Sequence, residues 1–377
     1  MNIGILTLPL HTNYGGILQA YALQTVLENM GHNVVVFDTS NEYPLPPLWK
    51  LPICFAKRII MKCLGKQQKV FIERHLNYER SVIAQYMQPF VDNHIHRKVI
   101  RNFTELKKKD YEAIVVGSDQ VWRAVYFSPM WLHQSIDNAF LAFAENWEIK
   151  RLSYAASFGT DKWEYTDEET KRCKQLIGKF DAISVREKGG VDLCREHFNV
   201  SALQVLDPTM FLTREDYMAL FKERNTPPSN GNLLVYVLDE SPELTNLVND
   251  IVTKRHLVPF SVNNPYETDE SKPLEKRIKI SVESWLRGFY DAELVVTDSF
   301  HACVFSIIFR KQFVVVGNKK RGMARFESLL KMFGLEDRLI NDSKEFEVLD
   351  TINYDAVYEK YELLKKESFH FLQANLQ

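Results

Sequence analysis

The sequence predicts an α/β protein built from two Rossmann-like domains that face a cleft. Short apolar runs alternate with segments of helical periodicity along the chain, a pattern typical of parallel sheets covered by helices. Residues 225–232, rich in Pro, Gly and Asn, interrupt this alternation. The length of 377 residues suits two or three domains. We therefore expect an N-terminal domain at 1–225, a C-terminal domain at 226–345 and a helical tail at 346–377 that could pack back on the first domain.

Short apolar runs mark the strands of the first domain, since buried parallel strands read as continuous hydrophobic segments. Between the first two runs, apolar residues recur at helical spacing up to Gly31, a residue type that often ends helices. This order of strand, helix and strand predicts a βαβ unit. The strands are expected at residues 2–8, 34–38, 113–116, 152–157, 182–185 and 203–206, and the first helix at 18–31.

The same alternation restarts after the linker and predicts a second parallel sheet. The charged tail has the periodicity of an amphipathic helix from about residue 348. In the second domain, strands are expected at 233–238, 258–262, 293–297 and 313–316, and helices at 243–255, at 282–290 and from about 301.

The composition excludes several classes of protein. Lys and Arg number 47 and Asp and Glu 49, so the net charge of −2 gives no reason to expect a nucleic-acid partner. The five cysteines form no C-x-x-C pair, which indicates reduced thiols and predicts no metal site. The N-terminus lacks the pattern of a signal peptide, and no apolar stretch has the length of a membrane span. We therefore expect a cytoplasmic protein.

Residues 48–64, LWKLPICFAKRIIMKCL, mix apolar side chains with Lys50, Lys57, Arg58 and Lys62. The favoured interpretation is a helix or lid that packs on its own domain and keeps its lysines in water. The alternative is a surface helix that contacts anionic lipid. That alternative would add a peripheral location at the inner face of the membrane.

Polar or glycine-bearing loops follow the predicted strands, and in doubly wound sheets ligands bind beyond the carboxyl ends of the strands. Two adjacent glycines, Gly15 and Gly16, allow a ligand to approach the backbone closely before a helix begins. The candidate substrate-binding residues in the loops of the first domain are Asn13, Tyr14, Gly15, Gly16, Ser118, Asp119, Gln120 and Ser157.

The segment 295–302 is the most informative of these loops, because a buried strand runs through a polar turn directly into a helix. Free N–H groups at a helix N-terminus bind phosphate or carboxylate. His301 falls in the first helical turn, and histidine is the side chain that exchanges a proton near neutral pH. The alternative is that Asp298 or Ser299 only caps the helix and that His301 is half-buried without a function.

Two arginine positions are candidates for anion binding. Arg186 ends an apolar strand and offers a planar, permanently charged group for an anion, and the alternative is an ion pair with Glu187 or another carboxylate. Arg321 and Arg325 form a basic cluster after a later strand that could hold a phosphate, or that could simply begin a solvated helix. Of the two, Arg321 is the favoured candidate.

Taken in order, these segments resemble the polysaccharide pyruvyl transferase family. The similarity spans roughly residues 3–339. It implies a two-domain fold like that of the GT-B glycosyltransferases, and transfer of pyruvate from phosphoenolpyruvate to two hydroxyls of a glycan sugar, forming a ketal in surface polysaccharide biosynthesis. The matching segments are NYGGILQAYALQ at 13–24, VGSDQVW at 116–122, YAASFG at 154–159, SVRE at 184–187, DPT at 207–209 and VTDSFH at 296–301.

The resemblance also implies roles for individual residues. His301 would be the general acid, Arg186 would clamp the anionic donor, and Asp298 would orient His301 or take a hydroxyl proton. The donor phosphoenolpyruvate is a substrate, so no cofactor is expected, and the acceptor would be a saccharide or a lipid-linked oligosaccharide. Arg123 and Ala302 depart from the family pattern, which has Asn and Gly there, and Arg123 could alter the choice of acceptor.

Two other functions fit the same predicted fold, because a fold does not fix an activity. A GT-B-type glycosyltransferase would bind a nucleotide sugar, with Asp239 or Glu240 as the acidic group for the ribose. A non-catalytic glycan- or metabolite-binding protein would have kept the fold alone. The presence of both Arg186 and His301 argues against this last alternative.

Overall fold

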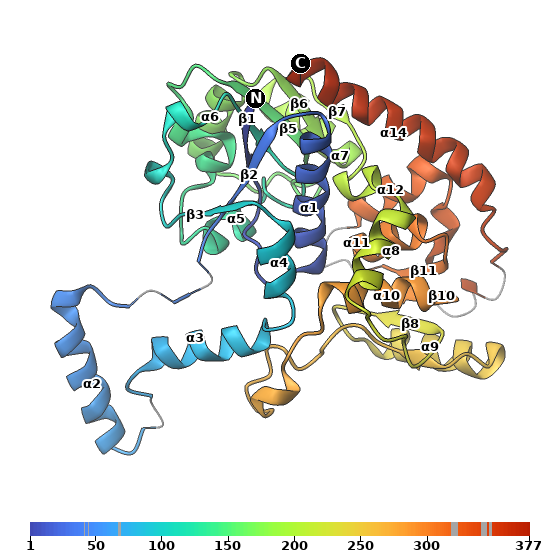
Figure 1. Ribbon diagram of the computed structural model, residues 1–377, viewed down its shortest axis with the longest axis horizontal. Coiled ribbons are helices and arrows are strands. Elements are labelled where there is room, and N and C mark those ends of the chain that lie inside the picture. The colour runs from blue at the N-terminus through green and yellow to red at the C-terminus, as the bar shows by residue number, and fades with distance from the viewer. Residues whose placement is uncertain (41, 44, 67–68, 318–322, 341–344, 347–348) are drawn as a thin grey trace.

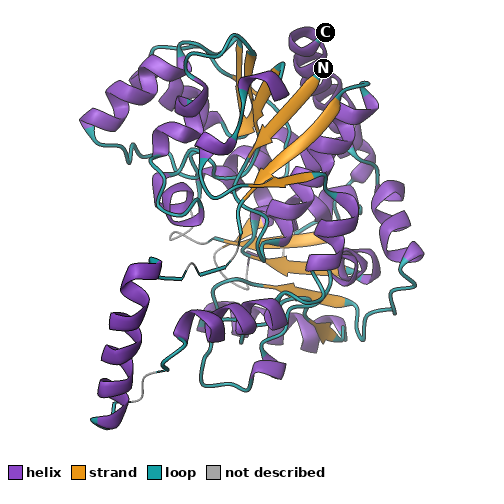
Figure 2. Cartoon of the chain, turned by 60° about the vertical axis from the view of Figure 1, so that its left-hand side comes forward, coloured by secondary structure: helices purple, strands orange, loops and turns teal. Residues whose placement is uncertain are grey.

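A computed structural model describes residues 1–377 except 41, 44, 67–68, 318–322, 341–344 and 347–348. Its strands form two separate parallel sheets with helices on their faces (Figures 1 and 2). The first sheet has the order β3-β2-β1-β4-β5-β6-β7 and the second the order β12-β11-β10-β8-β9. The prediction of an α/β protein with two Rossmann-like halves is therefore confirmed.

The strands of the first sheet are β1 (Asn2–Leu6), β2 (Asn33–Asp38), β3 (Arg97–Val99), β4 (Ala113–Val116), β5 (Lys150–Ala156), β6 (Ala182–Val185) and β7 (Leu203–Gln204). Those of the second sheet are β8 (Leu233–Tyr236), β9 (Pro259–Phe260), β10 (Leu294–Thr297), β11 (Gln312–Val316) and β12 (Leu339–Ile340). The linker predicted at 225–232 lies between the last strand of the first sheet and the first strand of the second.

The first half contains α1 (Tyr14–Asn29), α2 (Leu51–Cys63), α3 (Ile72–Ile83), α4 (Gln88–His94), α5 (Ala124–Met130), α6 (Asp167–Ile177), α7 (Lys188–Leu193) and α8 (Arg214–Glu223). The second half contains α9 (Pro242–Arg255), α10 (Val282–Asp291), α11 (Phe300–Ile308), α12 (Ala324–Phe333) and α14 (Tyr354–Leu376). Helix α1 is buried along most of its length and packs in the same apolar core as α11 and α14.

Several predicted strands are longer than the observed ones. The runs 2–8, 203–206 and 258–262 continue past the ends of β1, β7 and β9, and the apolar residues beyond those ends, Leu8, Leu206 and Val262, are buried although they lie outside the strands. The edge strand β3 was not predicted, since it contains only three residues and two of them are cations.

Helix α14 lies along both halves of the molecule (Figure 1). Near its start, the Tyr354 hydroxyl donates to the Ser306 carbonyl of α11 at 3.1 Å. Further along, the Ser368 hydroxyl accepts from the amide of Leu206 at 3.0 Å, next to the first sheet. The expected tail therefore forms a helix that contacts both halves, although its predicted start at residue 348 falls outside the described residues.

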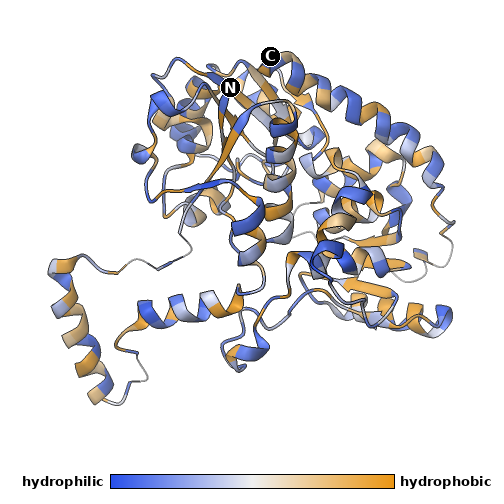
Figure 3. Cartoon of the chain, viewed as in Figure 1, coloured by the Kyte–Doolittle hydropathy of each residue, from blue (hydrophilic) through white to orange (hydrophobic). Residues whose placement is uncertain are grey.

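Helix α2 stands away from the two sheets, and the favoured interpretation that it packs on its own domain is wrong. None of its residues is buried in the described structure, although its hydropathy is that of a helix with an apolar side (Figures 1 and 3). Arg58 and Phe55 of this helix contact residues 70–73 of the neighbouring chain, so the sequence pattern of a packed helix is present without any residue buried in the described structure. The described helices include none with the length and hydropathy needed to cross a membrane.

Candidate active site

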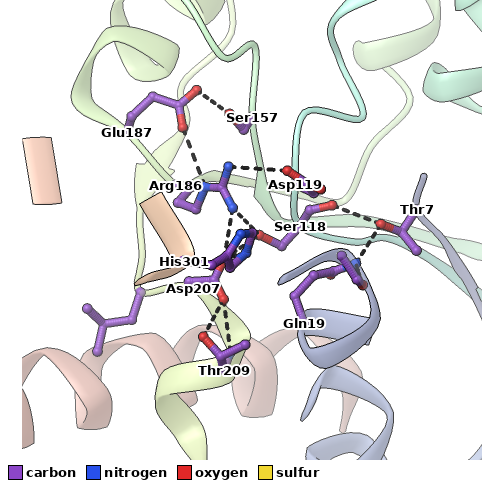
Figure 4. A network of polar contacts seen from close by, with 12 residues as sticks. Thr7, Gln19, Ser118, Asp119, Ser157, Arg186, Glu187, Asp207, Thr209 and His301 are labelled. Carbon is purple, nitrogen blue, oxygen red and sulfur yellow. Dashed lines mark hydrogen bonds and ion pairs between the residues drawn. The ribbon is translucent and has the colours of Figure 1, made fainter. Parts of the chain in front are cut away.

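The polar side chains that follow the strands of the first sheet meet at its carboxyl edge (Figure 4), as expected for a parallel sheet. Helix α11 of the second half brings His301 to the same place. The residues that meet there from the first half are Ser118 and Asp119 after β4, Ser157 after β5, Arg186 and Glu187 after β6, and Asp207 after β7.

Arg186 is buried among three carboxylates. Its Nη1 donates to Oδ2 of Asp207 at 2.9 Å, its Nη2 lies 3.6 Å from Asp119, and its Nε lies 3.9 Å from Glu187. The guanidinium carbon also lies 4.2 Å from the centroid of the Phe300 ring. The ion pairing with Glu187 or another carboxylate that the sequence left open is thus present, and the shortest pair is with Asp207.

These contacts hold both partners in their charged forms. Burial lowers the pKa of the Arg186 guanidinium, but the surrounding carboxylates, led by Asp207, raise that pKa by more. Burial raises the pKa of the Asp207 carboxyl, but its contacts with His301 and Arg186 hold that pKa well below the usual range. A buried charge without its partner costs several kcal/mol, so the two residues depend on each other for folding.

A hydrogen-bonded frame fixes this cluster. The Ser118 hydroxyl donates to Oδ2 of Asp207 at 2.9 Å, and the Ser157 hydroxyl donates to Oε1 of Glu187 at 2.9 Å. Both serines are fully buried. Gln120 lies further out, where its Oε1 accepts from Arg123 at 3.3 Å. Ser118 and Ser157, both predicted to bind substrate, therefore hold the buried carboxylates in place.

His301 lies between Asp207 and the backbone of Gly15. Its Nε2 is 3.7 Å from Oδ2 of Asp207. A Cβ atom at Gly15 would lie 2.1 Å from Nδ1 of His301, so only glycine leaves room for the imidazole there. Within the described part of the chain, Nε2 of His301 and both Nε and Nη2 of Arg186 are buried without a hydrogen-bond partner. The contact between His301 of the second half and the backbone of the first half therefore explains why residue 15 is glycine.

A pocket of about 280 Å³ opens beside His301 and is lined from both halves of the molecule. The N-termini of α1 and α11 both face it, through Gly15 and Ser299. The lining residues are Thr12, Asn13, Tyr14, Gly15, Tyr236, Leu238, Glu267, Lys279, Trp285, Ser299 and His301.

In the described structure, helices α1 and α11 both begin without a side-chain cap at the N-cap position. The side chains of Asn13 and Ser299 occupy the N-cap positions without making a capping hydrogen bond, and neither first turn contains an acidic residue. Uncapped N–H groups and the helix dipole favour an anion at such a place. Two such helix ends meet at this one pocket.

The remaining predicted loop residues have different positions. Asn13 donates to Asp119 at 3.3 Å across the pocket edge. Tyr14 forms a pocket wall, stacked on Trp285 with its hydroxyl donating to a backbone carbonyl. Gly16 lies one residue behind the lining, where a Cβ atom would meet only the Asn13 side chain, at 3.2 Å.

Asp298 is buried beside the pocket, and its carboxylate accepts from the backbone amides of Leu238 and Asp239 at 2.7 and 3.0 Å. It therefore shapes the loop that follows β8. The carboxylate that the structure places against Nε2 of His301 is Asp207. The resemblance implied that Asp298 orients His301 or takes a hydroxyl proton.

Two further basic side chains, Arg325 and Lys279, lie close to this cluster. Arg321 lies outside the described residues, but Arg325 of the same cluster is buried near Phe300, and burial and the charge of Arg186 lower its pKa to about 10. Lys279 lines the pocket, pairs with Glu267 at 2.8 Å and lies over the Tyr14 ring. Asp207 could have been selected from its strand-end position, but no pattern in the sequence marks Lys279.

The described residues contain no cluster of His, Cys, Asp or Glu side chains that could hold a metal ion. Arg123 pairs bidentately with Glu164, at 2.9 and 2.8 Å, and is absent from the pocket lining. Ala302 is fully buried behind His301. Neither departure from the family pattern adds a side chain to the described pocket.

Comparison with solved structures finds similar chains of low sequence identity. An MnaA–UDP co-structure from S. aureus is 14% identical, with a TM-score of 0.44, over 100% of this chain and 91% of that one. UGT89C1 from Arabidopsis thaliana, complexed with UDP-L-rhamnose, is 11% identical, with a TM-score of 0.47, over 98% of each chain. MurG from Acinetobacter baumannii is 10% identical, with a TM-score of 0.39, over 99% and 94% of the two chains.

Comparison with protein families gives a more specific result. No protein with a curated description matches the sequence significantly. The sequence profile for polysaccharide pyruvyl transferase, however, matches residues 13–320. The match begins at Asn13 of the pocket and includes Arg186, Asp207 and His301. The resemblance noted in the sequence is thus confirmed, and the chain belongs to the polysaccharide pyruvyl transferase family.

Proposed function

We propose that the protein transfers pyruvate from phosphoenolpyruvate to two hydroxyls of a glycan sugar. The observation that carries this proposal is the pocket at which two uncapped helix N-termini, Lys279 and His301 meet. Phosphoenolpyruvate carries a phosphate and a carboxylate on a small skeleton. Such a ligand needs positive groups close together and a proton donor at its vinyl carbon. In this proposal the two helix N-termini and Lys279, which is paired with Glu267, provide the positive groups, and His301 is the proton donor.

In the proposed reaction, His301 protonates C3 of phosphoenolpyruvate, and a sugar hydroxyl attacks C2. The C2–O bond to phosphate then breaks, and a second hydroxyl of the same sugar closes the ketal. One hydroxyl proton replaces the proton that His301 gave, and the other leaves with inorganic phosphate. Nδ1 of His301, which lies beside Gly15 of the pocket lining, is the nitrogen that we assign to proton transfer.

Asp207 and Arg186 support His301 from behind in this scheme. Asp207 at Nε2 fixes the orientation of the imidazole, a role like that of a buried carboxylate beside a catalytic histidine. Arg186 holds Asp207. Because the Arg186 side chain is buried and does not line the pocket, we propose positioning of Asp207 as its main role, in place of direct clamping of the donor.

The acceptor site that we propose is the neighbouring pocket of about 360 Å³, which shares Thr12 and Glu267 with the first. Its wall includes Tyr43, with the Arg80 guanidinium 3.7 Å from the ring centroid, and Glu79 of α3. Aromatic faces and carboxylates suit the apolar faces and hydroxyls of a sugar.

Thermal unfolding of the purified protein with phosphoenolpyruvate, pyruvate, phosphate, UDP and UDP-sugars tests the donor. At about 100 times its dissociation constant, a ligand stabilises the folded state by about 2.7 kcal/mol. We expect a selective shift with phosphoenolpyruvate that Lys279→Met removes and His301→Gln keeps. A shift with pyruvate and phosphate alone, or none in the panel, would contradict the proposal.

The second candidate is a glycosyltransferase that uses a nucleotide sugar. The observation in its favour is a separate pocket of about 290 Å³ after β8, lined by Glu240 among others. A carboxylate at such a strand end suits a ribose. A shift with UDP that Glu240→Gln abolishes, without any shift from phosphoenolpyruvate, would favour this function instead.

A further inference from the structure

The basic arm, which we define as residues 43–72, carries charge of one sign. It contains six lysines and arginines and no aspartate or glutamate, whereas the remaining residues together carry a net charge of −8. An excess of this kind in one short segment indicates a negatively charged partner. The cations are Lys50, Lys57, Arg58, Lys62, Lys66 and Lys69.

One side of α2 contacts the end of the same arm and the start of α3. Arg58 pairs bidentately with Glu73, at 2.5 and 2.7 Å, and donates to the carbonyl of Val70. The ring of Phe55 lies 5.1 Å from that of Phe71. These contacts set the orientation of the helix and decide which of its sides remains open.

The open side of α2 carries exposed apolar side chains beside Lys57. Ile53, Ile60 and Leu64 are spaced seven and four residues apart, which places them on one face of a helix. Their exposed fractions are 66%, 59% and 72%. Leu48 and Trp49, at the start of the helix, are 83% and 71% exposed. An amphipathic helix normally turns such a face to its own core, and an uncovered face of this size marks an interaction site.

The charge of the arm identifies the partner. A second copy seated on the same face would bring two sets of six cations together, which is unfavourable at a symmetric contact. A bilayer with anionic headgroups accepts both features, since the apolar face enters the acyl boundary while the lysines stay among the phosphates. We propose that the basic arm binds the surface of an anionic lipid bilayer through α2, with Trp49 at the headgroup level.

This inference is independent of the pyruvyl-transfer proposal, and its test requires no substrate. The full-length protein is sedimented with vesicles of phosphatidylcholine alone or of phosphatidylcholine mixed with phosphatidylglycerol. We expect binding only to the mixed vesicles, weakened at about 1 M salt, where the screening length falls to about 3 Å. Equal binding to both compositions, or binding to neither, would overturn the proposal.

Variants locate the contact on the arm. Each lysine near an anionic surface strengthens binding about fivefold, so Lys57→Gln/Lys62→Gln should weaken binding about 25-fold. Ile60→Asp, on the apolar face, should reduce binding by at least tenfold. The matched control Lys171→Gln/Lys174→Gln removes two exposed lysines from α6 and should bind as the wild type does.

Folding does not confound these variants, because the substituted side chains of α2 are not buried in the described structure. Unchanged circular dichroism and thermal unfolding confirm this for each variant. Unchanged binding by Ile60→Asp would refute the assignment of the apolar face. Light scattering that shows a dimer which Ile60→Asp dissociates would overturn the proposal in favour of a second copy of this chain.

Discussion

Gly15→Ala tests whether the contact between α1 and His301 sets the position of the acid. The added Cβ atom would lie 2.1 Å from Nδ1 of His301, whereas a carbon and a nitrogen in contact are about 3.5 Å apart. The imidazole or the first turn of α1 must therefore move by about 1.4 Å. A misplacement of about 1 Å at a reacting group costs roughly 100-fold in rate, or about 2.7 kcal/mol of barrier.

Stability should change much less than activity in this variant. Alanine in a helix gains roughly 0.5–1 kcal/mol over glycine, which offsets part of an overpacking cost of about 1–3 kcal/mol. The assay is release of phosphate from phosphoenolpyruvate with a saccharide acceptor, beside thermal unfolding. Gly16→Ala is the matched control, since its Cβ atom meets only the flexible Asn13 side chain at 3.2 Å and should cost less than fivefold in rate. Turnover by Gly15→Ala within threefold of the wild type would refute the reasoning.

Three other substitutions give separate tests. His301→Gln should lower turnover by about 10²–10⁴-fold, measured by phosphate release, while thermal unfolding stays close to that of the wild type. Asp207→Asn should lower the free energy of unfolding by about 3–5 kcal/mol near neutral pH, because it leaves the Arg186 charge without its closest partner. Since the folded-state pKa of Asp207 lies well below its unfolded value of about 3.9, this contribution is complete above about pH 5 and declines as the pH falls below the unfolded value towards the folded one. In urea titrations, the difference in stability between the wild type and Asp207→Asn should therefore narrow by about 1 kcal/mol between about pH 5 and pH 3, and a difference that is constant with pH would contradict this. Lys279→Met should raise the apparent KM for phosphoenolpyruvate about 10–100-fold with a smaller change in kcat, and an unchanged KM would remove Lys279 from the donor site.

Much of the fold could be predicted because buried parallel strands are continuous apolar runs. The runs that became β4 and β6 have the bounds expected from the sequence. The predicted place of 48–64 was wrong for a physical reason. The periodicity of a sequence indicates that a helix has an apolar side, but it does not indicate whether another part of the protein covers that side. In the described structure, no residue of α2 is buried.

The site was predictable only in part, because it depends on contacts between residues far apart in the chain. Strand-end position identifies Asp119 and Arg186, and helix-start position identifies His301. Sequence alone could not show that the buried partner of His301 is Asp207, which lies 94 residues away, or that Lys279 reaches the same pocket from the segment before α10. The resemblance implied only that Asp298 orients His301 or takes a hydroxyl proton.

Helix α14 limits how the two halves can move relative to each other. Its 23 residues make a rod about 35 Å long, held to α11 at one end through Tyr354 and to the first sheet at the other through Ser368. The chain also passes between the halves at 225–232. Because the chain joins the halves at these two places, a change in pocket width would be a hinge rotation about one axis through both of them, rather than free rotation about a single point. Substrate entry and product release would then use the same direction of opening. Truncating α14 before Ser368 would remove its contact with the first sheet and leave the pocket residues unchanged.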